Sequence, residues 1–198
     1  MARPEPFRQT ETMPQLIAPD VRFHRSFLAA MDEFRAEGRG SAADNSMVGY
    51  DIQQRGAVWQ DPAVFAEYVA ELRSQADENA PRPPGRVPCT NLWWVDGDEY
   101  LGRIAIRHRL TDFLREYGGH IGYDIRASVR RRGHATAMLR ATLPVSAAIG
   151  VDPALLTCDT TNTASRKVIE ACGGVFEDRR AEKLRYLVPT SAGAAHTG

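Results

Sequence analysis

The stretch from Arg126 to Ala135 holds the residues of this chain that are best suited to bind an anion. It reads Arg-Ala-Ser-Val-Arg-Arg-Arg-Gly-His-Ala, so four arginines precede the small residues Gly133 and Ala135. The start of a helix exposes unpaired N–H groups and the positive end of the helix dipole. A small residue such as Gly133 lets an anion come close to those N–H groups. We expect this turn to cradle a pyrophosphate group; the alternative, for the stretch taken alone, is a solvated loop that caps an ordinary helix.

The residues on either side indicate a strand before this turn and a helix after it. Ile121, Tyr123 and Ile125 alternate with less apolar residues, which is typical of a strand with two different faces. Apolar residues then recur at helical spacing to about Ile149, with Pro144 expected to kink or split the helix. A buried strand over 154–158 follows, so the segment predicts a βαβ unit with two parallel strands.

The rest of the chain predicts further helices and strands around this unit. We expect a flexible arm over 1–13, one domain over 14–188 and a disordered tail over 189–198. Within the domain, the spacing of apolar residues and caps predicts the following elements: a strand at 15–18, helices at 20–35 and 61–77, a long functional loop at 37–59, a hairpin at 90–96 and 100–107, a short helix or turn at 110–117, a helix at 163–172, and a strand pair at 175–178 and 184–187. The predicted fold is α/β (α+β), with a mixed, mostly antiparallel sheet and helices on both faces.

The composition excludes several classes of protein. The chain has 198 residues, of which 25 are basic and 25 acidic, and 43% are hydrophobic. The balanced charge does not favour a nucleic-acid or membrane partner, and no apolar run approaches the roughly 20 residues of a spanning helix. Cys89, Cys158 and Cys172 fit neither a zinc spacing nor a disulfide framework, so we expect no metal and a cytoplasmic location.

Two motifs in this order resemble the GNAT N-acetyltransferases. Arg130-x-x-Gly133-x-Ala135 after a strand is similar to the coenzyme A signature of that family, and Asn162 to Ser165 before Cys172-Gly173-Gly174 is similar to its second motif. The resemblance covers roughly residues 89–187. The combination of Arg107-His108, Gly119 to Tyr123 and Asn162 to Ser165 resembles a bacterial subgroup of predicted acetyltransferases. It implies a central parallel βαβ unit whose two strands splay apart to hold acetyl-CoA.

The resemblance also implies roles for individual residues. Backbone groups of Ile125 and Ala127 would hold the pantetheine arm and the acetyl carbonyl, and Asn162 and Ser165 would line the arm, although Asn162 also suits a plain helix cap. The residues implied to bind the pyrophosphate are Arg130, Arg131, Arg132, Gly133, His134, Ala135 and Thr136.

Three residues are candidates for the proton transfers that amine acetylation needs. His120 is the first candidate base, because it lies near the position of a catalytic glutamate in several family members; a structural histidine is the alternative. Asp124 shares the His120 face and could orient it, bind the amine or cap the strand. The tyrosine that often serves as the acid would fall at Ile169, so Tyr123 or Tyr186 would have to replace it.

The resulting prediction is an acetyl-CoA-dependent N-acetyltransferase that acts directly on a primary amine of a small molecule. An aminoglycoside-type antibiotic is one alternative acceptor, which Asp44 and Asp51 could meet. A non-catalytic acyl-CoA sensor is the other alternative, and the resemblance leaves a homodimer open as the oligomeric state.

Overall fold

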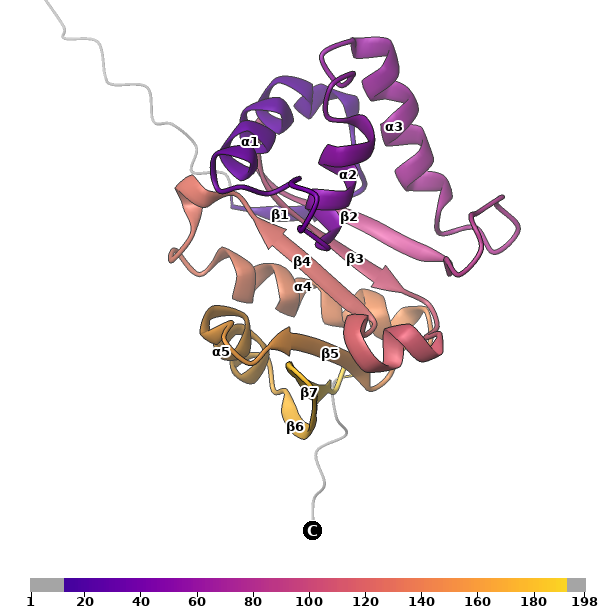
Figure 1. The fold of residues 1–198 in the computed structure, drawn as a ribbon, viewed down its shortest axis with the longest axis vertical. Coiled ribbons are helices and arrows are strands. Elements are labelled where there is room, and N and C mark those ends of the chain that lie inside the picture. The colour runs from indigo at the N-terminus through magenta and orange to yellow at the C-terminus, as the bar shows by residue number, and fades with distance from the viewer. Residues whose placement is uncertain (1–12, 192–198) are drawn as a thin grey trace, which may run out of the picture.

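The computed structural model describes residues 13–191 (Figure 1). Its elements are, in chain order, β1 (Gln15–Ile17), a 3-10 turn (Val21–Phe23), α1 (His24–Ala36), α2 (Met47–Arg55), α3 (Pro62–Ser74), β2 (Cys89–Asp96), β3 (Glu99–Arg107), a π-helical turn (Leu114–Gly118), β4 (Ile121–Ile125), a 3-10 turn (Ala127–Val129), α4 (His134–Ala148), β5 (Ala154–Asp159), α5 (Thr163–Ala171), β6 (Val175–Arg180) and β7 (Lys183–Val188). The predicted arm lies outside the described residues except for Met13.

Two antiparallel sheets meet at the centre of the molecule. One has the strand order β1-β2-β3-β4 and the other the order β5-β7-β6. Strands β4 and β5 lie where the two sheets meet and run in the same direction, joined by α4 (Figure 1). This is the predicted βαβ unit, and the α/β fold class with helices on both faces is confirmed.

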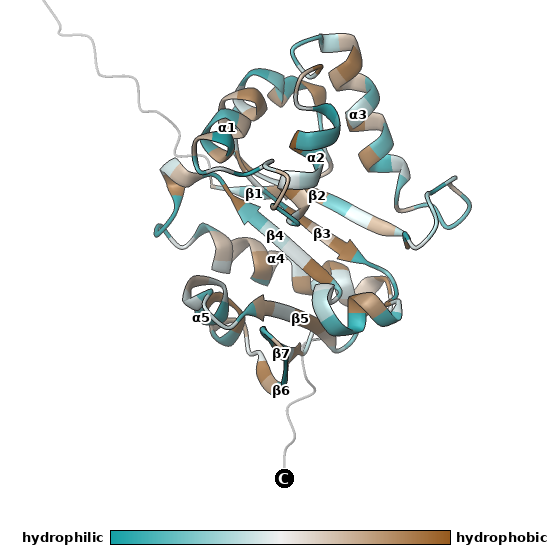
Figure 2. Ribbon diagram, in the orientation of Figure 1, coloured by the Kyte–Doolittle hydropathy of each residue, from teal (hydrophilic) through white to brown (hydrophobic). Residues whose placement is uncertain are grey.

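Alternation along β2 divides the apolar residues between two cores. Trp93 and Val95 face α1, α2 and α3 in an aromatic cluster with Phe27, whereas Trp94 faces α4 and α5. In Figure 2, α1 and α3 alternate between brown and teal along their length, as expected of helices with one buried and one solvated face. Each face of the β2–β3 hairpin is therefore covered by its own layer of helices.

Helix α2 corrects the prediction of a loop over 37–59. Ser46 caps it by accepting a hydrogen bond of 3.0 Å from the Gly49 N–H group. Gly49 is required here, because a Cβ atom would lie 2.0 Å from Asp44 Oδ2. The pattern was missed because Gly49 and the polar residues after it obscure the helical spacing of Val48 and Ile52, which are buried.

Smaller differences concern the ends of elements. The second predicted helix ends at Ser74 rather than Asp77, and α4 runs through Pro144 without being split. At the start of the predicted tail, Thr190 is buried and donates hydrogen bonds to Val151 O at 2.6 Å and Asp152 Oδ1 at 2.9 Å. The chain is therefore held in place as far as Thr190, and 192–198 lie outside the described residues. Between residues 13 and 191, no helix combines the length and the apolar character needed to cross a bilayer.

A buried polar network fixes α2 and α3 to the first sheet. Arg103 of β3, which is 8% exposed, pairs with Asp51 of α2, and the Tyr68 hydroxyl of α3 donates to the same carboxylate at 2.9 Å. Removing one partner of a buried ion pair leaves the other charge without compensation. Asp51, considered above as a contact for a cationic acceptor, is instead part of this internal network.

We predict that Asp51→Ala lowers the free energy of unfolding by about 3 kcal/mol, because it strands the Arg103 guanidinium. Asp32→Ala is the matched control, since it removes the exposed Arg35–Asp32 pair and should cost under about 1 kcal/mol. Urea denaturation of both variants checks this. Equal losses would show that the buried Arg103–Asp51 pair contributes no more to the free energy of unfolding than an exposed pair does.

Candidate functional site

Strands β4 and β5 are joined at one end only. The His120 N–H group donates to Leu155 O at 2.6 Å, and the Leu155 N–H group donates to His120 Nδ1 at 2.9 Å. Gly119 lets the chains approach, because its φ is +61° and a Cβ atom there would lie 2.5 Å from Leu155 O. Beyond this clasp the two strands form no ladder with each other, and they diverge (Figure 1).

The diverging strands present unpaired peptide groups to each other. Arg107 N–H donates to His120 O at 2.8 Å and Arg126 N–H to Leu101 O at 2.9 Å, so even-numbered residues of β4 bond to β3. In an antiparallel pair the alternate residues point the other way. The peptide groups of Ile121, Tyr123 and Ile125 therefore face the gap. We call the space between β4 and β5 beyond the clasp the wedge.

The open end of the wedge leads to the start of α4. Arg131 and Gly133 have left-handed φ values of 63° and 84°, and the helix has no side-chain cap. Within residues 13–191, the N–H groups of residues 131–136 have no hydrogen-bond acceptor, and the first such bond is from Ala137 to Gly133 O at 3.0 Å. We call residues 131–136 the amide turn. Six consecutive donors at the positive end of a helix dipole suit a bound anion.

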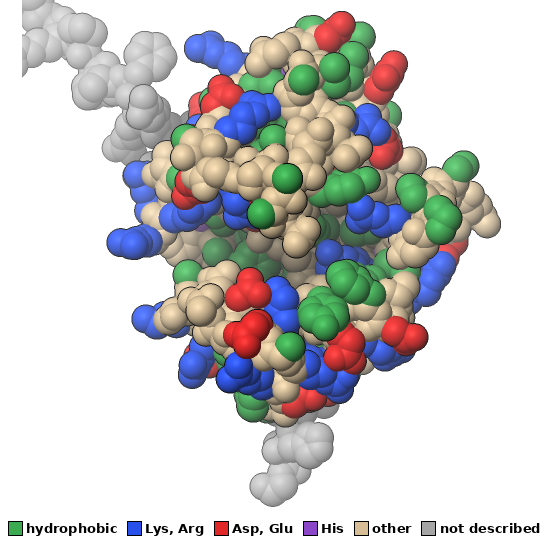
Figure 3. Space-filling view, in the orientation of Figure 1, with side chains coloured by type: hydrophobic (Ala, Val, Ile, Leu, Met, Phe, Trp, Pro, Cys, Tyr) green, Lys and Arg blue, Asp and Glu red, His purple; other side chains and the backbone are tan. Residues whose placement is uncertain are grey.

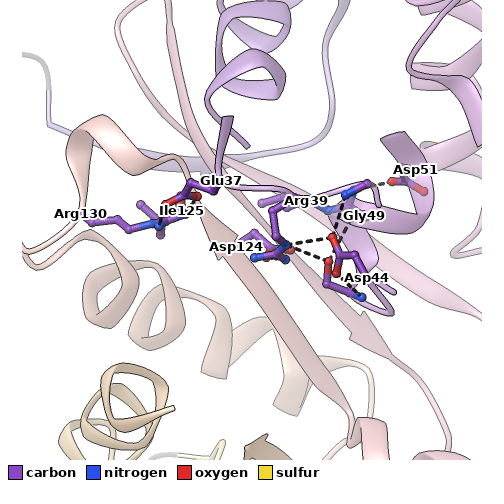
Figure 4. A network of polar contacts seen from close by, with 11 residues as sticks. Glu37, Arg39, Asp44, Gly49, Asp51, Asp124, Ile125 and Arg130 are labelled. Carbon is purple, nitrogen blue, oxygen red and sulfur yellow. Dashed lines mark hydrogen bonds and ion pairs between the residues drawn. The ribbon is translucent and has the colours of Figure 1, made fainter. Parts of the chain in front are cut away.

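The arginines of this stretch divide into two groups. Arg126 pairs with Glu33 at 2.5 Å, and Arg130 binds both oxygens of Glu37 at 2.5 and 2.8 Å while its Nε donates to Ile125 O at 2.8 Å (Figure 4). A carboxylate therefore holds the Arg130 side chain in this conformation, and the predicted contact of Arg130 with the pyrophosphate requires this exposed ion pair to open. Arg131 and Arg132 are exposed and form no ion pair within the described chain, so they remain for an anion.

His120 is the residue of the clasp rather than a free base. Because Nδ1 accepts the Leu155 N–H group, the neutral ring carries its proton on Nε2. Burial, together with the charges of Arg115 and Arg107, lowers the pKa of His120 to about 4. Neither ring nitrogen offers a lone pair at neutral pH, which corrects the interpretation of His120 as the base and favours the structural alternative.

Asp124 is likewise committed to an internal ion pair. Its carboxylate accepts from Arg39 at 2.8 Å, and Arg39 also binds Asp44 at 3.1 Å (Figure 4). The side chain of Asp124 is 11% exposed. Asp44 in turn accepts from the N–H groups of Gly40 and Ser46, so both carboxylates are held by partners within the protein.

Tyr123 reaches across the wedge to the start of α5. Its hydroxyl lies 2.8 Å from Ser165 Oγ, and Asn162 Oδ1 caps α5 by accepting from Ser165 N–H at 3.0 Å. Burial raises the pKa of Tyr123, so the hydroxyl stays protonated at neutral pH. Ile169 is fully buried. Tyr123 thus places a hydroxyl in the wedge from β4, whereas a tyrosine at position 169 would have come from α5.

The remaining candidates lie at the edges of the site. Tyr186 donates to Glu170 at 3.3 Å and lines a concavity between α5 and β7, away from β4. His134 accepts from Trp94 Nε1 at 3.3 Å, so its ring faces the core and only its backbone N–H belongs to the amide turn. Ala127 begins the 3-10 turn that connects β4 to Arg130.

Sequence reasoning missed the residues of α1 and the following segment that hold the site. Glu33, Glu37 and Arg39 bind Arg126, Arg130 and Asp124 from 85 to 93 positions away. No spacing rule connects such distant charges, so only the fold could reveal them. Figure 3 shows a hollow across this face of the molecule, between the part formed by α1 and α2 and the part formed by α5 and β5.

Comparisons with known proteins identify the family. Residues 42–175 match a family model described as the acetyltransferase (GNAT) domain. Among curated proteins no sequence matches the chain.

Solved structures share the fold at low sequence identity. The chain is similar to a ribosomal-protein-S5-alanine acetyltransferase from Vibrio fischeri, with a TM-score of 0.63, 14% identity, and coverage of 90% of this chain and 94% of that one. It is also similar to RimJ of Mycobacterium smegmatis in complex with CoA-disulfide, with a TM-score of 0.61, 17% identity, and coverage of 89% and 81%. The microcin C7 self-immunity acetyltransferase MccE, in complex with acetyl-CoA and AMP, gives a TM-score of 0.59, 13% identity, and coverage of 91% and 93%.

The family match spans more than half of the chain, and the wedge and amide turn lie within the matched residues. The predicted resemblance is thereby confirmed: the protein belongs to the GNAT acetyltransferase family and is an acyltransferase.

Proposed function

We propose that the protein transfers an acetyl group from acetyl-CoA to a primary amine of a small molecule. The observation that carries this proposal is the row of peptide groups on the β4 edge that face the wedge, starting at the clasp, together with the six unpaired N–H groups of the amide turn. This arrangement suits an extended arm that ends in a diphosphate. A bound acetyl-CoA would supply a thioester for attack by the amine.

The residues of the site then have separate tasks. The N–H groups of the amide turn bind the diphosphate, with Arg131 and Arg132 beside them. The β4 edge at Tyr123 and Ile125 bonds the pantetheine arm and offers an N–H donor to the thioester carbonyl. Asn162 and Ser165 form the opposite wall. Arg130 does not bind the phosphate but fixes the Ile125 carbonyl, which holds the turn in place.

Two observations support a small acceptor. Helix α2 lies over the outer face of β4, where a Cβ atom on Gly122 would meet Met47 Cε at 2.8 Å. Arg39 ties the preceding segment to Asp124. Together these contacts reduce the space through which an acceptor can reach β4. An aminoglycoside has no support, because Asp44 and Asp51 are both neutralised by arginines inside the protein.

A protein N-terminus is the second candidate acceptor. Several of the structural neighbours are named as acetyltransferases of ribosomal proteins, for S5 alanine or for L7/L12. A sensor without catalysis is disfavoured, because the Tyr123 hydroxyl offers a proton donor inside the wedge. Mass spectrometry of products from acetyl-CoA with a panel of small amines and with peptide N-termini separates these functions.

The amide turn gives the sharpest test of cofactor binding. Thr136 occupies the third position of α4, so Thr136→Glu places a carboxylate beside the unpaired N–H groups. We predict a stabler helix, by about 0.3–1 kcal/mol, together with an acetyl-CoA dissociation constant raised at least about tenfold.

Thr136→Gln is the matched control, because it has the same shape without the charge and should bind acetyl-CoA nearly as the wild type does. Calorimetric titration measures both variants. Unchanged affinity in Thr136→Glu would mean that the diphosphate binds elsewhere.

The clasp predicts opposite outcomes for two substitutions of His120. Asn can accept the Leu155 N–H group in place of the ring, so His120→Asn should retain most of the turnover, whereas loss of a general base costs about a hundredfold or more. His120→Leu leaves a buried amide unpaired and should lose about 1–3 kcal/mol of stability. Steady-state kinetics and urea denaturation test this, and equal inactivation of both variants would restore His120 as the base.

The clasp also predicts how stability depends on pH. The folded pKa of His120 is about 4 and the unfolded value about 6.5. Because the unfolded state takes up the proton first, this contribution is fully present above pH ~6.5 and is lost as the pH falls toward 4. The wild type should therefore lose more stability than His120→Asn over this range, as measured by denaturation at a series of pH values. If the stability of the two proteins changed in parallel with pH, His120 would not be a neutral ring bonded to Leu155 in the folded state.

Tyr123→Phe removes the proposed proton donor. We predict that kcat falls by about a hundredfold or more while the dissociation constant of acetyl-CoA changes little, because the hydroxyl acts on the departing thiolate. Tyr186→Phe, which removes a hydroxyl outside the wedge, is the control. A Tyr123→Phe enzyme as fast as the wild type would show that the thiolate leaves unassisted.

A further inference from the structure

Arg107, the last residue of β3, is a half-buried cation that has only carbonyl partners. Its Nη1 donates to Gly118 O and Gly119 O, each at 3.0 Å. In the part of the chain that the structure describes, no carboxylate contacts this guanidinium, and its Nε and Nη2 have no acceptor. A guanidinium has five donors in a planar fork that matches a carboxylate or a phosphate.

Two nearby arginines are balanced by acids, whereas Arg107 is not. Arg103 on the same strand is paired with Asp51, and Arg39 is paired with Asp44 and Asp124. Burial lowers the pKa of Arg107, and the like charges of Arg86 and Arg103 lower it further. A positive charge in these surroundings is costly unless an anion joins it.

The position of Arg107 places this charge next to the closed end of the wedge. Gly118 and Gly119, whose carbonyls it binds, come directly before the clasp residue His120. A Cβ atom on Gly122 would lie 3.8 Å from Arg107 Nη1 and 2.8 Å from Met47 Cε, so the guanidinium lies between β4 and the start of α2.

The turn beside Arg107 carries one arginine and two exposed aromatic rings, along with Asp112 and with Glu116, which pairs with Arg180. Arg115 is exposed, forms no ion pair among residues 13–191, and lies close enough to lower the pKa of His120. Phe113 and Tyr117 on the same turn are 67% and 46% exposed and contact each other at 5.4 Å between ring centroids. In Figure 3, blue and green side chains gather at the end of the hollow near this turn.

We propose that Arg107, aided by Arg115, binds an anionic group of the amine acceptor, so that the natural acceptor carries a carboxylate or phosphate as well as its primary amine. This inference rests on the proposed function, because it requires the thioester to reach the closed end of the wedge. It predicts an acceptor that carries a negatively charged group, unlike a polycationic antibiotic.

Anion binding at Arg107 orients the amine for the transfer. The amine nitrogen forms a bond to the acetyl carbon and the carbon–sulfur bond breaks. The amine loses its proton to water, since His120 has no free lone pair and the Asp124 carboxylate is held by Arg39, and the thiolate takes a proton from the Tyr123 hydroxyl, which is then restored from solvent. Arg107 acts by binding the acceptor and takes no part in these proton movements.

Paired acceptors that differ only in the anionic group test the proposal. One arm compares α-amino acids with their carboxamides, and a second compares aminoalkyl phosphates with the corresponding amino alcohols. We expect the wild type to prefer the anionic member of at least one pair by about tenfold or more in kcat/KM. The arm that shows the preference identifies the anion as carboxylate or phosphate.

Variants then assign the preference to this site. Arg107→Gln should raise KM for the anionic acceptor at least about tenfold more than it raises KM for the neutral analogue. Arg115→Gln, at an exposed position without structural contacts, should show a smaller change of the same kind and covers the case in which Arg107→Gln fails to fold. Arg25→Gln, which removes one exposed charge from α1, is the control and should behave as the wild type does.

Two different failures can be told apart. If the protein neither binds acetyl-CoA nor acetylates any amine, the proposed function itself is wrong. If it acetylates amines but shows no preference for the anionic member of either pair, or if Arg107→Gln affects anionic and neutral acceptors equally, the proposed function stands and the anion site at Arg107 is overturned.

Discussion

The two hydrogen bonds between His120 and Leu155 are the constraint on which the site depends. They hold β4 and β5 together at their first residues, and the sheet stops pairing beyond that point. Buried peptide groups are nearly always bonded in folded proteins, so a row of unpaired ones is costly unless solvent or a ligand bonds them. Here the unpaired peptide groups of Ile121 and Tyr123 on β4 and the uncapped start of α4 lie on either side of a bonded turn over 126–130.

Charged residues from the N-terminal half of the domain form ion pairs with β4 and with the turn that follows it. Glu33, Glu37 and Arg39 follow one another along the end of α1 and the segment after it, and each binds a residue of β4 or of the turn that follows. Glu33 also accepts from the Ser128 N–H group at 2.9 Å. Two of the four arginines in the basic stretch, Arg126 and Arg130, therefore form ion pairs within the protein. The proposed anion site depends mainly on backbone amides, which need no side-chain charge to be effective.

Local patterns in the sequence were enough to predict the central unit. The alternation of Ile121, Tyr123 and Ile125 gave the strand, and Gly133 marked the helix start, because these features depend on neighbouring residues only. The clasp could not be predicted in this way, since His120 and Leu155 meet only when the crossover helix is folded. The helix over 47–55 was missed because its buried face is short and interrupted by glycine. The same limit applies to His120 and Asp124. Their residue types indicate groups that could move a proton or bind an amine, but in the fold both are bonded to partners that are distant in the chain, Leu155 and Arg39.

Hydrogen–deuterium exchange of the backbone amides, followed by NMR with and without coenzyme A, tests the central claim most directly. If the wedge and the amide turn hold the cofactor, the amides of residues 131–136 and of Tyr123 and Ile125 exchange freely in the isolated protein and become protected on binding, whereas the amides of α3 are unchanged. Protection that appears elsewhere while residues 131–136 continue to exchange freely would contradict the account.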